Sequence, residues 1–121
     1  MKPQKDNKVF AAELEKRTLT FGLNIIRLAA ILPSRPESNV IRSQITKSGT
    51  SIGANYREAN RARSRADFRN RIKICESEAS ETKYWLEIIL GTEWLSREKV
   101  MREHKECSEL LAIFTAISHN T

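Results

Sequence analysis

Polar and apolar residues alternate with helical spacing over four long stretches of this chain. In the first stretch, apolar side chains return every three or four positions from Leu14 to Leu32. This spacing places them on one face of a helix, because an α-helix completes a turn every ~3.6 residues. Pro33 and Pro36 then interrupt the pattern, since proline cannot donate the backbone hydrogen bond that a continuing helix requires. The pattern therefore predicts a helix over about residues 8–32.

The same spacing recurs and predicts further helices over about residues 38–60, 65–94 and 97–118. Ser64 and Ser96 precede the last two, where a serine hydroxyl can accept a hydrogen bond from a free backbone N–H. The residues expected on the four inward faces are Leu14, Thr18, Phe21, Ile25, Leu28 and Leu32; Ile41, Ile45, Ser48, Ile52, Asn55 and Ala59; Phe68, Ile72, Cys75, Ala79, Thr82, Leu86 and Ile89; and Val100, His104, Cys107, Leu111, Phe114 and Ser118.

Helices joined by short loops pack as antiparallel neighbours, so the sequence predicts an all-α fold, an antiparallel up-down-up-down four-helix bundle. The 121 residues are expected to form a single domain, residues 1–121, with one core. The N-terminal MKPQKDNK lacks the apolar run of a signal peptide, and no stretch reaches the length needed to span a bilayer. We therefore expect a cytoplasmic protein with no membrane partner.

The second helix contains two glycines, Gly49 and Gly53, beside its inward face. Glycine inside a helix costs about 1 kcal/mol relative to alanine, so a compensating gain is expected. We interpret the glycines as sites where a partner helix approaches closely. A phosphate-binding loop is disfavoured, because the run SGTSIG lacks the Lys-Ser/Thr pair of that motif and a preceding strand.

Positive charge is concentrated in one short segment of the chain. The net charge is +6 overall, and residues 57–73 alone carry seven basic residues against two acids. Residues 1–56 carry nine basic residues against four acids, whereas residues 74–121 carry five against nine. The candidate nucleic-acid-binding residues, which we call the basic segment, are Arg57, Arg61, Arg63, Arg65, Arg69, Arg71 and Lys73. Arginine stays charged and binds phosphate through paired N–H groups, so the segment predicts contact with RNA or DNA backbones.

Candidate catalytic and metal-binding groups are sparse. The chain has two histidines and no cluster of metal ligands, and neither His104 nor His119 lies three residues after a glutamate, as a Glu-x-x-His motif requires. We therefore expect no catalytic residues, no metal and no cofactor, hence no enzyme. Cys75 and Cys107 are expected to be buried free thiols.

A polar cluster is expected between the second and third helices. Asn55 falls on an inward face, with Glu58 one turn later and Glu81 on the adjacent helix. Buried amides need hydrogen-bond partners, so we predict that Asn55, Glu58 and Glu81 form a structural cluster that fixes helix register. Apolar residues beyond the inward faces, among them Trp85 and Trp94, predict a homo-oligomer.

Two runs, QITKSGTSIGANYREANRARSRADF and ICESEASETKYWLEII, resemble the 23S rRNA intervening-sequence protein family, which includes the accessory variability protein of diversity-generating retroelements. The resemblance implies a four-helix bundle that assembles into a ring-like homopentamer without catalytic residues. For the retroelement branch it implies nucleic-acid binding and a reverse transcriptase partner. The family pattern maps onto Ser48, Ser51, Asn55, Glu58, Glu78 and Glu81. The sequence departs from it at residues 60–63, where many members have glycines.

Two functional hypotheses follow from these observations. The first is a non-catalytic, homo-oligomeric bundle that binds RNA or DNA backbones through the basic segment. The alternative is a protein-interaction scaffold or accessory subunit without direct nucleic-acid binding, whose arginines meet acidic groups such as those in residues 74–121 of a neighbouring subunit.

Overall fold

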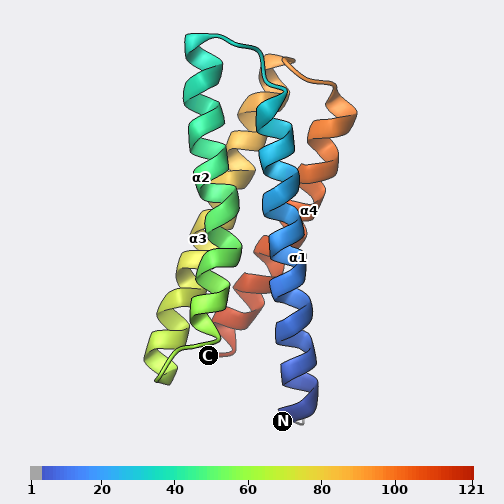
Figure 1. The fold of residues 1–121 in the computed structure, drawn as a ribbon. Helices are drawn as coiled ribbons and strands as arrows, with labels where there is room; N and C mark the ends of the chain where they lie inside the picture. The colour runs from blue at the N-terminus through green and yellow to red at the C-terminus, as the bar shows by residue number, and fades with distance from the viewer. Residues whose placement is uncertain (1–3) are drawn as a thin grey trace.

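The structure, a computed structural model, describes the backbone of residues 4–121 and the side chains from residue 7 onward. It contains helices α1 (Gln4–Ala30), α2 (Pro36–Ala59), α3 (Arg65–Thr92) and α4 (Arg97–His119). Successive helices run in opposite directions, which confirms the predicted all-α, up-down-up-down bundle (Figure 1). No helix in the described part of the chain is long and apolar enough to cross a bilayer.

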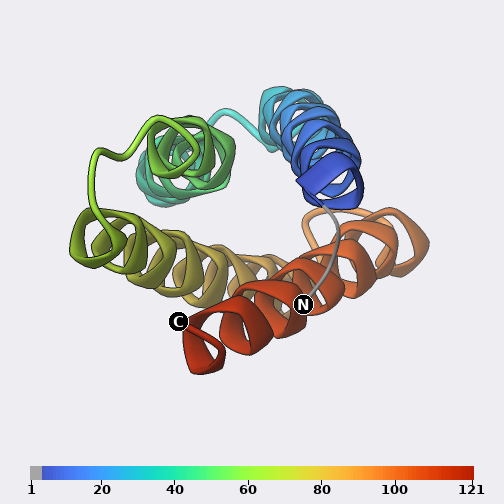
Figure 2. The same cartoon turned by 90° about the horizontal axis from the view of Figure 1, so that it is seen from below.

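Each helix packs against its two neighbours around the bundle. Viewed along the bundle, α1 and α2 form one side and α3 and α4 form the other (Figure 2). Helix α1 packs on α4 less extensively than the other neighbouring pairs pack on each other. The bundle is therefore most open along its α1–α4 side.

The core lies where the inward faces were predicted. All six residues predicted to face inward from the first helix are at most 5% exposed, including Leu32, which follows the end of α1. Helix α4 differs, because its buried line runs through Glu103 and Leu110, whereas His104 and Leu111 are half-buried. The prediction was wrong by one position at these two places, because from Val100 the buried line advances by three and then four residues, whereas four and then three were predicted.

Several helix boundaries differ from the prediction: α1 spans Gln4–Ala30 and not about 8–32, and two further differences have local reasons. Helix α2 begins at Pro36, earlier than predicted, because proline lacks an N–H that the first helical position would leave unused. Helix α3 ends at Thr92, because Glu93 adopts a left-handed conformation with φ of 59°. The start of α3 was predicted correctly, and the Ser64 hydroxyl accepts a hydrogen bond from the Asp67 N–H at 3.1 Å.

The glycines of α2 mark a close approach between α1 and α2, as predicted. A Cβ atom added to Gly49 would lie 2.8 Å from the Ile25 side chain. At Gly53 it would lie 3.0 Å from the Thr18 hydroxyl. Arg42 joins the same two helices, donating hydrogen bonds to the carbonyls of Ala29 at 2.9 Å and Leu32 at 2.6 Å. These bonds satisfy carbonyls that the end of α1 leaves without helical partners.

Candidate nucleic-acid interface

The basic segment forms one end of the bundle. Arg57 lies in the last turn of α2, Arg61 and Arg63 lie in the connection, and the remaining members lie in the first turns of α3. This connection lies at the same end of the molecule as the C-terminus and the start of α1 (Figure 1). The fold therefore gathers the seven cations at one corner, because an antiparallel turn brings the end of α2 next to the beginning of α3.

Four of these cations face solvent without a carboxylate partner. Arg61, Arg63, Arg65 and Lys73 are exposed, and none has a carboxylate of residues 7–121 within 4.0 Å. Arg57 is also exposed, and its Nε lies 4.0 Å from Glu15 Oε1, the limit of an ion pair. Charges held in this way remain available to an external anion, because nearby acids in the described chain do not neutralise them.

Two members of the basic segment are instead used within the fold. Arg69 donates a hydrogen bond to the carbonyl oxygen of Thr121 at 2.6 Å, which ties α3 to the C-terminus. Arg71 is half-buried and donates to Asn55 Oδ1 at 3.1 Å, which ties α3 to α2. We therefore assign these two arginines mainly structural roles, in contrast to the sequence-based prediction that all seven serve one surface.

The predicted polar cluster of Asn55, Glu58 and Glu81 does not form. Asn55 donates to the Ser51 carbonyl at 2.9 Å and accepts from Arg71. Glu58 is exposed, and Glu81 is exposed and accepts from Trp85 Nε1 at 3.2 Å. The reason is axial position, since ten residues of α3 separate Arg71 from Glu81, a rise of about 15 Å along a helix.

A different buried contact joins α2 and α3, seven residues before Asn55 on α2 and one residue after Glu81 on α3. The Thr82 hydroxyl donates to Ser48 Oγ at 2.8 Å, and both residues are at most 1% exposed. The Cys75 thiol donates to the Ile52 carbonyl at 3.5 Å. Hydroxyl and thiol groups thus form the buried hydrogen bonds between α2 and α3 that were predicted for the Asn55 amide and the carboxylates of Glu58 and Glu81.

Aromatic rings are absent from the exposed part of the basic segment. Tyr56 is buried and packs edge-on against Phe114 at a centroid distance of 5.5 Å, and Phe68 is half-buried. Burial raises the pKa of the Tyr56 hydroxyl, in keeping with a core position. Because single-strand binding platforms stack bases on exposed aromatic rings, this corner is suited to phosphates and not to bases.

Outside the basic segment, one arginine of the described residues forms close carboxylate contacts between helices. Arg17 on α1 contacts Glu106 on α4 through both Nε and a terminal nitrogen, each at 2.7 Å, and Glu109 at 2.8 Å. Its hydrogen bond to Glu106 raises the pKa of the guanidinium above its usual range. These bonds tie α1 to α4.

The two cysteines are buried and unreactive. Burial raises the pKa of Cys75 to about 12 and that of Cys107 to about 12, so both remain protonated thiols at neutral pH. The Cys107 thiol donates to the Ala79 carbonyl at 3.2 Å. His104 contacts Glu87 at 2.9 Å on the surface between α3 and α4, where it pairs the two helices.

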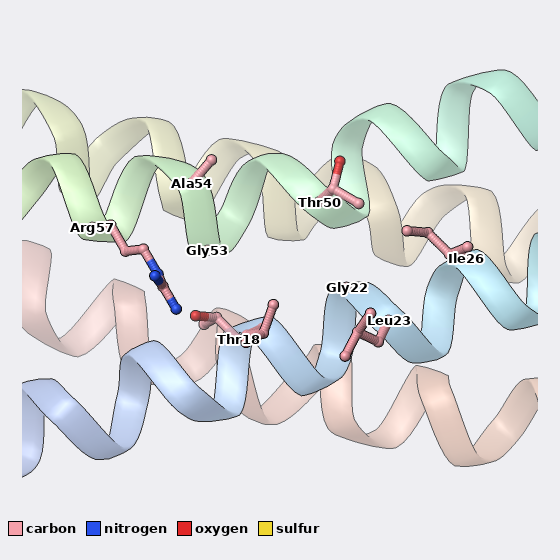
Figure 3. Close-up of a pocket in the computed structure, with 9 residues that line it drawn as sticks. Thr18, Gly22, Leu23, Ile26, Thr50, Gly53, Ala54 and Arg57 are labelled. Atoms are coloured by element: carbon pink, nitrogen blue, oxygen red, sulfur yellow. The ribbon is translucent and has the colours of Figure 1, made fainter.

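An apolar groove runs along the outer side of α1 and α2 next to the basic segment. Its volume is about 260 Å³, and Leu19, Leu23 and Ile26 form its α1 side. Gly53 and Ala54 form much of the α2 side, and Arg57 reaches across one end toward Thr18 (Figure 3). These α1 side chains are 42–50% exposed.

Sequence analysis located the surplus apolar surface on the third and fourth helices and missed α1. In the structure Trp85 and Trp94 are half-buried and pack against the core. The i, i+4, i+7 spacing of Leu19, Leu23 and Ile26 could have revealed this apolar surface, because it places the three side chains on the side of α1 opposite its inward face.

Comparison with known proteins agrees with this architecture. The family described as 23S rRNA-intervening sequence protein matches residues 12–116. A crystal structure of a protein of unknown function from the S23 ribosomal protein family of Bacteroides thetaiotaomicron VPI-5482 is similar, with 39% sequence identity and a TM-score of 0.80. The similarity covers 86% of this chain and 96% of that one. No curated protein matches this chain significantly. With most of its length matched by the family and its fold shared with a solved relative, the chain belongs to the 23S rRNA-intervening sequence protein family.

Proposed function

We propose that this protein is a non-catalytic, homo-oligomeric bundle that binds RNA or DNA through phosphate contacts at the basic segment. The observation that carries the proposal is the set of four exposed cations, Arg61, Arg63, Arg65 and Lys73, without carboxylate partners among residues 7–121. Guanidinium and ammonium groups that neutralise phosphates release condensed counterions, which drives binding without reading base sequence. The lack of exposed aromatic rings at this corner supports the same reading.

A homo-oligomer is supported by the groove and by the charge distribution. The α1–α2 half of the chain, residues 1–56, carries an excess of five positive charges, and residues 74–121 carry an excess of four negative charges. A second copy can therefore place its acidic α3–α4 side over the apolar groove of the first. Helix α3 also offers Ile74 and Tyr84, which are 41% and 55% exposed, as apolar groups for such a contact.

Such a contact joins different faces of two copies. Repeating it produces a closed ring if the rotation from one copy to the next adds up to a full turn. A pentamer, the number that the family resemblance implies, is the ring we propose. Several basic corners on one ring would bind one nucleic acid together, so weak individual contacts add through avidity.

The experiment is a binding titration with a labelled duplex DNA and a labelled structured RNA. The double variant Arg61→Glu, Arg65→Glu reverses the charge of two unpaired cations. It should bind the DNA and the RNA at least about tenfold more weakly, because each lost charge-assisted contact contributes roughly 1.5–3 kcal/mol. The matched control is Arg97→Glu with Lys105→Glu, which changes the net charge equally on exposed residues of α4. The control should retain most of the affinity.

The outcome also separates the proposal from the scaffold alternative. If neither nucleic acid binds the wild type, while the Arg61→Glu, Arg65→Glu variant has a lower mass in solution, the arginines serve contacts between subunits. If both double variants weaken binding equally, net charge and not the basic segment governs the interaction, and the proposed interface is wrong.

A further inference from the structure

A second hollow lies on the more open α1–α4 side, in the half of the bundle away from the basic segment. It has a volume of about 290 Å³ and is formed by one face of α1 and the first turns of α4. Leu28 and Ile31 give it an apolar wall. This size is close to the lower limit of small-molecule sites in proteins, about 300 Å³.

Three cations line this hollow and none is neutralised within the described chain. Arg27 comes from α1, and Lys99 and Arg102 come from α4. Arg27 donates a hydrogen bond to Asn24 Oδ1 at 3.2 Å, and none of the three cations has a carboxylate of residues 7–121 within 4.0 Å. The hollow therefore offers converging positive charge from two helices to one small anion.

A largely buried glutamate lines the same hollow, with its carboxylate oxygens accessible. Glu103 is 9% exposed, and its side chain has no hydrogen-bond or ion-pair partner among the described residues. Burial raises the pKa of Glu103, Arg102 opposes that rise, and Glu106 adds to it. No buried side-chain oxygen or nitrogen of the described residues lacks a hydrogen-bond partner, so the unpartnered carboxylate oxygens of Glu103 are accessible and can accept hydrogen bonds from a ligand.

We propose that this hollow binds a small organic anion that also carries N–H donors, with its anionic group between Arg27, Lys99 and Arg102 and its donors at Glu103. An anion without donors would satisfy the cations but would meet repulsion from the carboxylate. A ligand with both features satisfies both sets of groups, and its carbon framework can lie on Leu28 and Ile31. The site is independent of the basic segment and of the proposed nucleic-acid binding.

Two probes test the assignment by calorimetric titration at constant ionic strength. Guanosine 5′-monophosphate combines a phosphate with two adjacent N–H donors of guanine, which match the two oxygens of a carboxylate. Sulfate is an anion without donors. The wild type should bind the nucleotide saturably and more tightly than sulfate.

The variants separate the two parts of the site. Arg27→Gln with Arg102→Gln should weaken both probes by at least about tenfold, because each lost charge-assisted bond is worth that much. Glu103→Gln, which keeps the size of the side chain, should weaken the nucleotide and leave sulfate unchanged or tighter. The control Arg97→Gln with Lys105→Gln removes the same charge from exposed positions of α4 outside this hollow. Arg61→Glu with Arg65→Glu should also retain nucleotide binding.

Three results would overturn the proposal. They are an absence of saturable nucleotide binding to the wild type, an equal effect of the Arg27, Arg102 variant and its control, and an unchanged nucleotide affinity in Glu103→Gln. Circular dichroism of each variant should match the wild type, since Glu103 is replaced by a side chain of equal size and the other substituted residues lie at the surface. Failure of nucleic-acid binding at the basic segment would leave these expectations unchanged.

Discussion

Gly49 shows how one missing side chain sets the distance between α1 and α2. The Ile25 side chain occupies the space that a Cβ atom at position 49 would need, at 2.8 Å. Ile25 is fully buried, so it cannot swing out to make room. The helix-forming cost of glycine, about 1 kcal/mol, is therefore offset by the close packing of the two helices.

Gly49→Ala should destabilise the protein by roughly 1–3 kcal/mol, because overpacking a rigid core forces strained side chains or a backbone shift. The measurement is the free energy of unfolding from urea titrations. Gly91→Ala is the matched control, since a Cβ atom at position 91 meets nothing within 4 Å. That control should be neutral or stabilising by up to about 1 kcal/mol. Equal effects of the two substitutions would show that propensity and not packing governs Gly49.

At the level of single residues, the sequence predicted burial better than it predicted polar contacts. The spacing of apolar residues identified Phe21 and Ile25 as core residues, because helical periodicity determines which side faces inward. It could not identify the partner of Asn55, because Arg71 and Glu81 lie on the same helix and only the axial offset between α2 and α3 distinguishes them. The bonds from Arg42 to the end of α1 were equally hidden, since they depend on the path of the loop.

Helix α1 is apolar on two opposite sides. One side faces the core through residues such as Phe21, and the other exposes Leu19, Leu23 and Ile26 along the groove. A helix of a monomeric bundle needs one apolar stripe, with polar residues on the remaining surface. The second stripe supports the proposed contact with a second copy of the chain.

Leu23→Glu should lower the mass of the protein in solution, because it places a charge in the groove that the second copy is proposed to cover. Static light scattering after size-exclusion chromatography measures that mass. Leu23 is 42% exposed, so the folded monomer should tolerate the change, and circular dichroism should remain helical. The control is Val40→Glu, at an apolar residue that is 58% exposed and does not line the groove. A monomeric wild type, or a Leu23→Glu variant of unchanged mass, would contradict the assignment.

The existence, order and direction of all four helices followed from the sequence, because each has a long periodic stripe and the chain has few residues that break helices. Their ends were less predictable. Glu93 ends α3 in a left-handed conformation that glycine usually supplies, so residue type gave no warning of the stop. The half-buried state of Trp94 likewise depends on where the following turn directs the chain.

Across the whole molecule, charge is separated both along the bundle and around it. The basic segment occupies one end, and the acidic excess lies in the α3–α4 half. The sequence located the basic segment by simple counting, whereas its division into free and internally bonded cations required the fold. Arg69 contacts a residue 52 positions away, which no local pattern reveals.

The separation of charge gives one molecule two kinds of surface. The end that carries the basic segment is suited to phosphates, and the acidic side is suited to the positively charged half of another subunit. In a ring built from such contacts, the ends that carry Arg61, Arg63 and Arg65 would all point the same way. The account therefore predicts one strongly cationic face on the assembled protein.

The most direct test of this account is the salt dependence of nucleic-acid affinity. For duplex DNA, the logarithm of the binding constant should fall linearly with the logarithm of salt concentration, by about 0.9 for each phosphate neutralised. The four free cations of each subunit that contacts the duplex should contribute roughly −4 to the slope, and Arg61→Glu with Arg65→Glu should make it less steep by about 2 for each such subunit. Binding that is independent of salt, or a slope unchanged in that variant, would contradict the proposal that these cations contact phosphates.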